Sequence, residues 1–139
     1  MSRIIKIDSS GKQRTQLIKA VVLAIRELAR QQEPANEARD MAAFIAEALQ
    51  AISDGIDESV SAWEKRGYWI KADKFRMEWA WTGDMARKFK SAVIGQDWNN
   101  IPAYSAEIAK KFYRKKVSEN HRMGKPWVGT FDLMTRKEP

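Results

Sequence analysis

The stretch from residue 68 to residue 94 constrains the fold most, because its apolar residues lie along two sides of a helix. At about 100° per residue, the first stripe contains Tyr68, Ala72, Phe75, Trp79, Ala86, Phe89 and Val93. The roughly opposite stripe contains Ile70, Met77, Trp81, Met85 and Ala92. A surface helix needs one apolar stripe, whereas a helix that is apolar on two sides is buried between neighbours. We therefore predict that residues 68–94 form the central helix of the domain.

The preceding segment has the most regular helical pattern in the chain. Its apolar residues recur every three or four positions, at Ala38, Met41, Ile45, Leu49, Ile52, Ile56, Val60 and Trp63. The pattern continues through Asp54 and Gly55, so we predict one helix over residues 37–66. Gly55 falls on the apolar side, where we expect another helix to approach closely. Gly67 then ends this helix and leads into the next one as an antiparallel neighbour.

Two further helices are predicted on either side of this pair. Residues 12–32 carry a wide apolar face, and Pro34 ends that helix because proline cannot continue it. Residues 101–115 form a shorter fourth helix with a basic end.

The last part of the chain, residues 117–139, has no helical periodicity, and we predict an irregular extension there. It is too apolar to be a solvated tail, so we expect it to pack back across the bundle through Trp127, with disorder after about Leu133. The predicted fold over residues 1–139 is a single all-α domain. It is an up-down helical bundle of about four helices, arranged as two long antiparallel hairpins with this extension packed on it.

Composition excludes several classes of protein. A chain of 139 residues has the size of one domain, and the absence of cysteine excludes disulfide frameworks and thiolate metal sites. No apolar run reaches the roughly 18 residues of a membrane span, and there is no signal-peptide pattern. We therefore expect a cytoplasmic protein with no membrane partner and no cofactor.

The net charge of +7 is unevenly distributed along the chain. Residues 33–66 hold three Lys or Arg against eight Asp or Glu, whereas residues 101–139 hold nine against four. The acidic segment can satisfy part of the positive charge internally. The C-terminal excess is the part expected to meet an anion outside the protein.

A run of basic residues around two aromatic side chains is the strongest functional signal. The candidate nucleic-acid-binding residues are Lys110, Lys111, Tyr113, Arg114, Lys115, Lys116, Arg122 and Lys125. The cations would neutralise phosphates, and Tyr113 would stack on a base. Two simpler interpretations remain: these cations oppose the dipole at the end of a helix, or they pair with the acidic residues of the second helix. No helix-turn-helix, zinc-finger or RNP motif accompanies the run.

The second apolar stripe of residues 68–94 provides the alternative hypothesis. If Ile70, Met77, Trp81 and Met85 were not covered by the first helix and the C-terminal segment, they would form an interface of the kind found in homodimers and other protein complexes.

Catalysis and metal binding have weaker support. His121, the only histidine, has Glu119 and Ser118 nearby in sequence, but lacks a recognisable nucleophile or metal-ligand motif. The acidic residues along residues 37–66 are more typical of a solvated or paired face than of a metal site.

The leading hypothesis is therefore a non-catalytic helical binding module. Its basic C-terminal face contacts nucleic-acid phosphate, of DNA or RNA, as part of a larger assembly. The alternative is a self-associating or protein-binding bundle with no nucleic-acid role.

Overall fold

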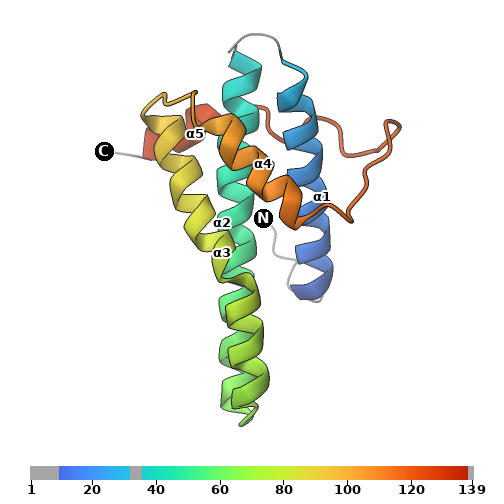
Figure 1. Ribbon diagram of the computed structural model, residues 1–139, viewed down its shortest axis with the longest axis vertical. Coiled ribbons are helices and arrows are strands. Elements are labelled where there is room, and N and C mark those ends of the chain that lie inside the picture. Colours follow the sequence, from blue (N-terminus) through green and yellow to red (C-terminus); the bar gives the residue numbers. More distant parts are fainter. Residues whose placement is uncertain (1–9, 32–35, 138–139) are drawn as a thin grey trace.

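The predicted all-α fold is confirmed. The computed structural model describes residues 10–31 and 36–137, in which every regular element is a helix and the helices pack against one another (Figure 1). In chain order the helices are α1 (Ser10–Ala29), α2 (Asn36–Lys65), α3 (Trp69–Ile94), α4 (Ile101–Lys111) and α5 (Thr130–Lys137). No helix within these residues is both long enough and apolar enough to cross a bilayer.

The central helix is α2, so the prediction that residues 68–94 hold this position was wrong. α2 packs against α1, α3 and α5, whereas α3 packs mainly against α2 and more sparingly against α4. Its first half is buried on several sides at once, at Met41, Ala42, Ala43, Ile45, Ala46, Ala48 and Leu49. The many alanines allow three helices to approach the same helix closely.

The second apolar stripe of α3 is covered along only part of its length. Met85 and Ala92 are buried and Trp81 is half-buried, but Ile70 and Met77 are 75% and 77% exposed. The reason is visible in Figure 1, where the paired ends of α2 and α3 extend beyond the other helices. We call this projection, residues 57–77, the arm, and the rest of the described chain the body.

Aromatic packing joins the two helices of the arm to each other and to the body. Trp63 of α2 meets Phe75 of α3 edge to face, with ring centroids 4.9 Å apart. Lys71 lies over the Trp63 ring at 4.5 Å. At the base of the arm, the guanidinium of Arg14 from α1 lies 5.1 Å from the Phe75 ring centre and 5.6 Å from that of Trp79.

The close approach expected at Gly55 occurs at another glycine. A Cβ atom placed on Gly55 would meet nothing within 4 Å, so this glycine does not serve a helix contact. A Cβ atom on Gly83 would lie 2.9 Å from the Ser53 Oγ atom. α2 and α3 therefore approach closely where Gly83 faces Ser53.

The C-terminal segment packs back on the bundle as predicted, and Trp127 is buried there. Its last part is not irregular as predicted, because residues 130–137 form the helix α5, and the expected disorder after about Leu133 was wrong for the same reason. Asp40 of α2 stabilises the start of α5 by accepting hydrogen bonds from the backbone N–H groups of Gly129 (3.1 Å) and Phe131 (2.9 Å). This carboxylate takes the role of a helix cap from a distant part of the sequence.

Two predicted helix ends also need correction. The fourth helix ends at Lys111, with Phe112 as its C-cap, and does not reach residue 115. Phe112 is buried against α3, which turns the chain out of the helical path. α1 ends at Ala29, and the predicted stop at Pro34 lies outside the described residues.

Candidate nucleic-acid interface

The end of α4 is held on α3 by aromatic contacts. The Phe112 ring centroid lies 5.2 Å from that of Trp81 and 6.5 Å from that of Trp79. The basic residues on either side of Phe112 are exposed. This anchor therefore fixes where the positive charge of the run is presented.

A first hollow of about 510 Å³ lies beside this anchor. Its lining residues include four aromatic side chains, three cations and one carboxylate: Trp79, Trp81, Phe112, Tyr113, Lys111, Arg114, Lys115 and Glu78. Lys111 Nζ lies 5.5 Å from the Trp81 ring centre. The Arg114 guanidinium lies 5.5 Å from the centre of the Tyr113 ring, and its Nε–H donates a 2.9 Å hydrogen bond to the Tyr113 hydroxyl. Tyr113 is 65% exposed, so much of its surface is open to a ligand.

A second hollow, of about 370 Å³, is lined by Lys116, the residue that follows Lys115 of the first hollow. It is lined by Gln16, Lys19, Lys116, Val117, Ser118, His121, Arg122 and Met123. Its three cations come from α1 and from the segment that follows α4, and no carboxylate is among these lining residues. Such a set suits an oxyanion such as a phosphate group.

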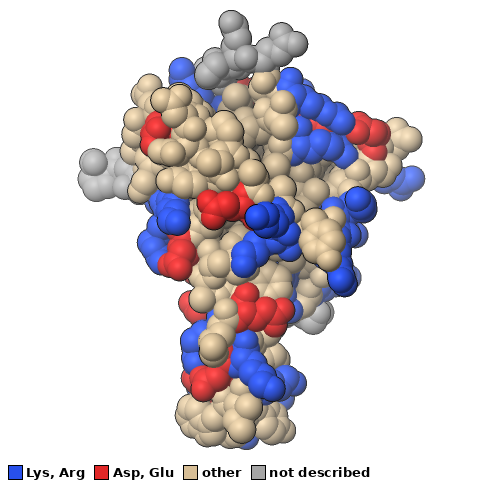
Figure 2. All heavy atoms as spheres, viewed as in Figure 1, with Lys and Arg blue, Asp and Glu red and all other residues tan. Residues whose placement is uncertain are grey.

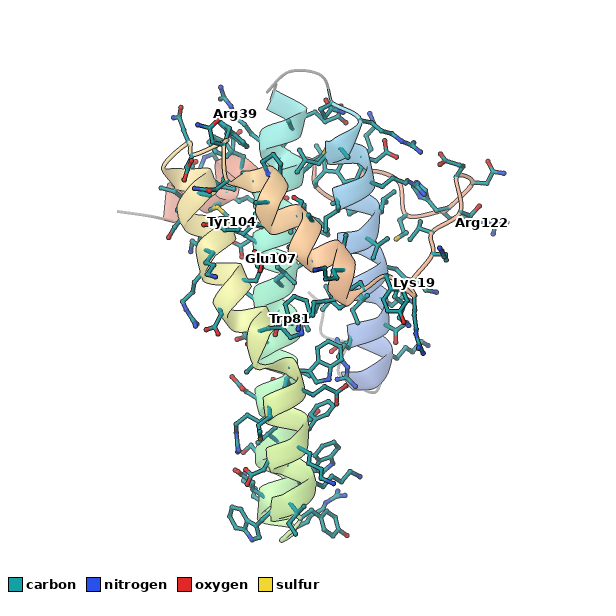
Figure 3. All side chains as sticks on the ribbon, in the orientation of Figure 1. Lys19, Arg39, Trp81, Tyr104, Glu107 and Arg122 are labelled. Atoms are coloured by element: carbon teal, nitrogen blue, oxygen red, sulfur yellow. The ribbon has the colours of Figure 1, made fainter. Side chains whose placement is uncertain are left out.

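The two hollows adjoin one another. Ile18 and Lys115 line the first hollow, and the residues that follow them in the chain, Lys19 and Lys116, line the second. Figure 2 shows Lys and Arg side chains gathered on this side of the molecule, and Figure 3 shows Lys19 and Arg122 on the same side, one from α1 and one from the loop beside it. We call the set Lys19, Lys111, Arg114, Lys115, Lys116 and Arg122 the basic face.

The structure brings most of the predicted nucleic-acid residues to these two hollows and separates two others from them. Lys110 is exposed on α4 but lines neither hollow. Lys125 lies elsewhere, where its Nζ is 3.1 Å from a Glu37 carboxylate oxygen. Glu37 also accepts a 3.3 Å hydrogen bond from the Trp127 indole. The hydrogen bond from Lys125, followed by that from Trp127, lowers the pKa of Glu37.

The segment that carries Lys116 and Arg122 is fixed to α1 by two arginines. Arg26 Nη1 donates to the Val117 carbonyl at 2.5 Å. The Arg30 guanidinium donates to both Glu119 carboxylate oxygens, at 2.7 and 3.2 Å. The hydrogen bond from Arg30 lowers the pKa of Glu119. The Glu119 carboxylate therefore pairs with Arg30 and forms no ion pair with Lys19, Lys116 or Arg122.

One simpler interpretation was that the cations of the basic run pair with the acidic residues of α2. The cations of the basic face do not form such pairs. Within residues 10–31 and 36–137, no carboxylate forms an ion pair with Lys19, Lys111, Lys115, Lys116 or Arg122. The cation that does pair with α2 is Lys125.

Sequence reasoning did not identify Lys19 or Arg14. Lys19 is one isolated cation on the polar side of α1, and only its position beside Arg122 makes it part of a site. Arg14 Nη1 is buried and has no hydrogen-bond partner within the described chain, and burial lowers the pKa of this guanidinium. A helical wheel of α1 places Lys19 on the polar side with Arg26 and Arg30, but places Arg14 within the apolar face, and it gives neither residue a partner.

His121 has a structural contact of its own. Its Nδ1 atom accepts a 3.2 Å hydrogen bond from the Met123 backbone N–H. This bond shapes the loop around the second hollow. Among the described residues there is also no group of three or more His, Asp or Glu side chains that would hold a metal ion.

The predicted protein interface is divided by the structure. Ile70 and Met77 lie exposed on the arm, Trp81 is half-buried next to Phe112, and Met85 is buried in the body. Figure 3 shows Trp81 near the end of α4. The four residues therefore do not form one exposed surface.

Comparison of the chain with protein-family models, with curated proteins and with solved structures found no match.

Proposed function

We propose that this protein is a non-catalytic binding module that contacts nucleic-acid phosphate through its basic face, as part of a larger assembly in the cytoplasm. The observation that supports this most is the pair of adjoining hollows. They present six cations, none of which forms an ion pair among the described residues, and one carboxylate, Glu78. The proposal concerns the sugar–phosphate backbone of DNA or RNA.

Phosphate contacts would supply the affinity. Each neutralised phosphate releases condensed counterions, so the logarithm of the binding constant falls with the logarithm of salt by about 0.9 per contact on duplex DNA. Tyr113 lies beside these cations with an exposed ring, which is the arrangement that lets a base stack next to a held backbone.

The first experiment measures fluorescence anisotropy of labelled single-stranded and duplex oligonucleotides at about 50 mM salt and upward. We expect binding that weakens steeply as salt increases. The absence of binding to DNA and RNA at the lowest salt would contradict the proposal.

The second experiment identifies the surface. The triple variant Lys19→Gln, Lys116→Gln and Arg122→Gln should reduce the salt slope by about 2 to 3, roughly one per lost contact. A control variant removes the same charge at exposed cations of α2 and α3, with Lys65→Gln, Lys74→Gln and Lys88→Gln. The control should keep the original slope. Equal losses in both variants would show that net charge, and not the basic face, drives binding.

A further inference from the structure

The tip of the arm is a tight and well-defined turn. α2 ends at Lys65 and α3 begins at Trp69. The Gly67 N–H donates to the Glu64 carbonyl at 3.0 Å, and the Tyr68 N–H donates to the Trp63 carbonyl at 2.9 Å. Gly67 has a φ of +84°, a conformation that other residues rarely adopt. The side chains that follow are therefore held in fixed positions at the end of the molecule.

Large apolar side chains are exposed at this tip. Tyr68, Trp69 and Ile70 are consecutive and are 52%, 60% and 75% exposed, and Met77 lies two helical turns further along α3. Figure 2 shows uncharged residues at the lower end of the molecule, with charged residues just above them. Single exposed apolar residues are ordinary, but a contiguous group at a protruding end indicates a contact surface.

The charges behind the tip are positive. Lys65, Arg66, Lys71 and Lys74 are exposed around it. Two acids of this region, Glu64 and Asp73, each form an ion pair with Arg76. A third, Glu78, lines a hollow together with Lys71 and Lys74. The apolar tip is therefore followed by four cations that the Glu64 and Asp73 carboxylates do not neutralise.

The shape and the order of these residues fit one class of partner. The tip protrudes beyond the other helices, with apolar groups at its end and cations behind them. A fluid interface accepts a protruding apolar tip without needing a matching cavity. Trp and Tyr side chains favour the boundary between headgroups and acyl chains, and Lys and Arg favour anionic headgroups.

We infer that the tip of the arm docks on an anionic lipid bilayer, with Trp69 and Ile70 entering the interface and Lys65, Arg66, Lys71 and Lys74 meeting the headgroups. The sequence-based expectation of no membrane partner considered spanning segments. A docked tip inserts side chains and needs no spanning helix.

The test uses the absence of native cysteine. The variant Ile70→Cys, labelled with an environment-sensitive fluorophore, reports the polarity at this one position. We expect a blue shift with vesicles that contain phosphatidylserine, and binding at least about tenfold weaker to vesicles of phosphatidylcholine alone. Equal affinity for both vesicles, or no shift with either, would overturn the inference.

Vesicle sedimentation of unlabelled protein provides a second measurement. Trp69→Ala should weaken binding about tenfold or more through lost apolar insertion. Lys71→Gln with Lys74→Gln should weaken it by roughly twenty-five-fold, because each cation near the surface contributes about fivefold. Unchanged binding in either variant would contradict the inference.

The basic-face variant, with Lys19, Lys116 and Arg122 each replaced by Gln, is the control. It removes three positive charges, one more than the tip variant, and should still bind vesicles within about twofold of the wild type. This variant separates the present inference from nucleic-acid binding, which it should impair. A shift of the labelled Ile70→Cys protein that grows with protein concentration in the absence of vesicles would show that a second copy occupies the tip, and would overturn the inference.

Discussion

The arm and the body are built from the same two helices, α2 and α3, and differ in how many neighbours those helices have. In the body, α1 and α5 pack against α2, and α4 packs against α3. Side chains such as Leu49 and Phe89 are completely buried there. In the arm, Ile70 and Met77 are equally apolar and remain exposed. Whether an apolar residue on a helix is buried therefore depends on which other helices pack at that position. The apolar repeat of its own helix does not decide this.

The largest expected effect comes from truncating the body. Phe89→Ala should destabilise the protein by about 3–5 kcal/mol, because the site is fully buried and tightly packed. Ile70→Ala, on the same helix in the arm, should change the free energy of unfolding by less than about 0.5 kcal/mol. Urea denaturation followed by circular dichroism measures both. Similar losses in the two variants would remove the distinction between arm and body.

The next effect concerns the close contact of α2 and α3. Gly83→Leu should cost about 2 kcal/mol, because its side chain would push Ser53 and separate the helices. Ala80→Leu, at an exposed position one turn earlier, is the control and should be nearly neutral. Thermal unfolding compares the two proteins, and equal midpoints would show that Gly83 does not set the spacing.

A smaller and opposite effect is expected at Gly55. Its surroundings are open, so Gly55→Ala should stabilise the protein by about 0.5–1 kcal/mol through helix propensity alone. Destabilisation in the same urea measurement would mean that α2 is not a continuous helix through this residue.

The smallest effect is a pH dependence of stability that comes from the hydrogen bonds of Glu37 with Lys125 and Trp127. These hydrogen bonds lower the pKa of Glu37 from its ordinary value of 4.5. They therefore stabilise the folded state above that pH, and this stabilisation is lost as the pH falls through the lowered pKa. Because the pair is partly exposed, the contribution should be less than about 1 kcal/mol.

The variant Glu37→Gln tests this dependence. The difference in unfolding free energy between Glu37→Gln and the wild type should be larger at pH 7 than at an acidic pH below the lowered pKa, where Glu37 of the wild type is also protonated. A difference that does not change between these pH values would contradict the assignment.

The sequence predicted the helices because their signals are local. The apolar repeat of residues 38–63 extends without interruption, and it identified α2 from the sequence alone. The position of α2 at the centre could not be predicted in the same way. The sequence shows that Ile70 and Met77 are apolar, but not that the other helices end before they reach them.

The missed features depend on contacts between distant residues. α5 is eight residues long, and its start is stabilised by Asp40, about ninety positions earlier. Lys125 was predicted to belong to the site but pairs with Glu37 elsewhere. Lys19 was not predicted but lines the same hollow as Arg122. Each of these outcomes requires a pairing that no local pattern contains.

Native-state hydrogen exchange tests the central claim most directly. That claim is that the body carries the stability, whereas the arm is held by the contact of α2 with α3 and, at its base, by the contact of Arg14 with Phe75. Backbone amides in residues 58–65 and 70–77 should exchange through local opening, with free energies at least about 2 kcal/mol below those of residues 42–52 and 85–93. The same opening free energy along the whole length of both helices would contradict the account.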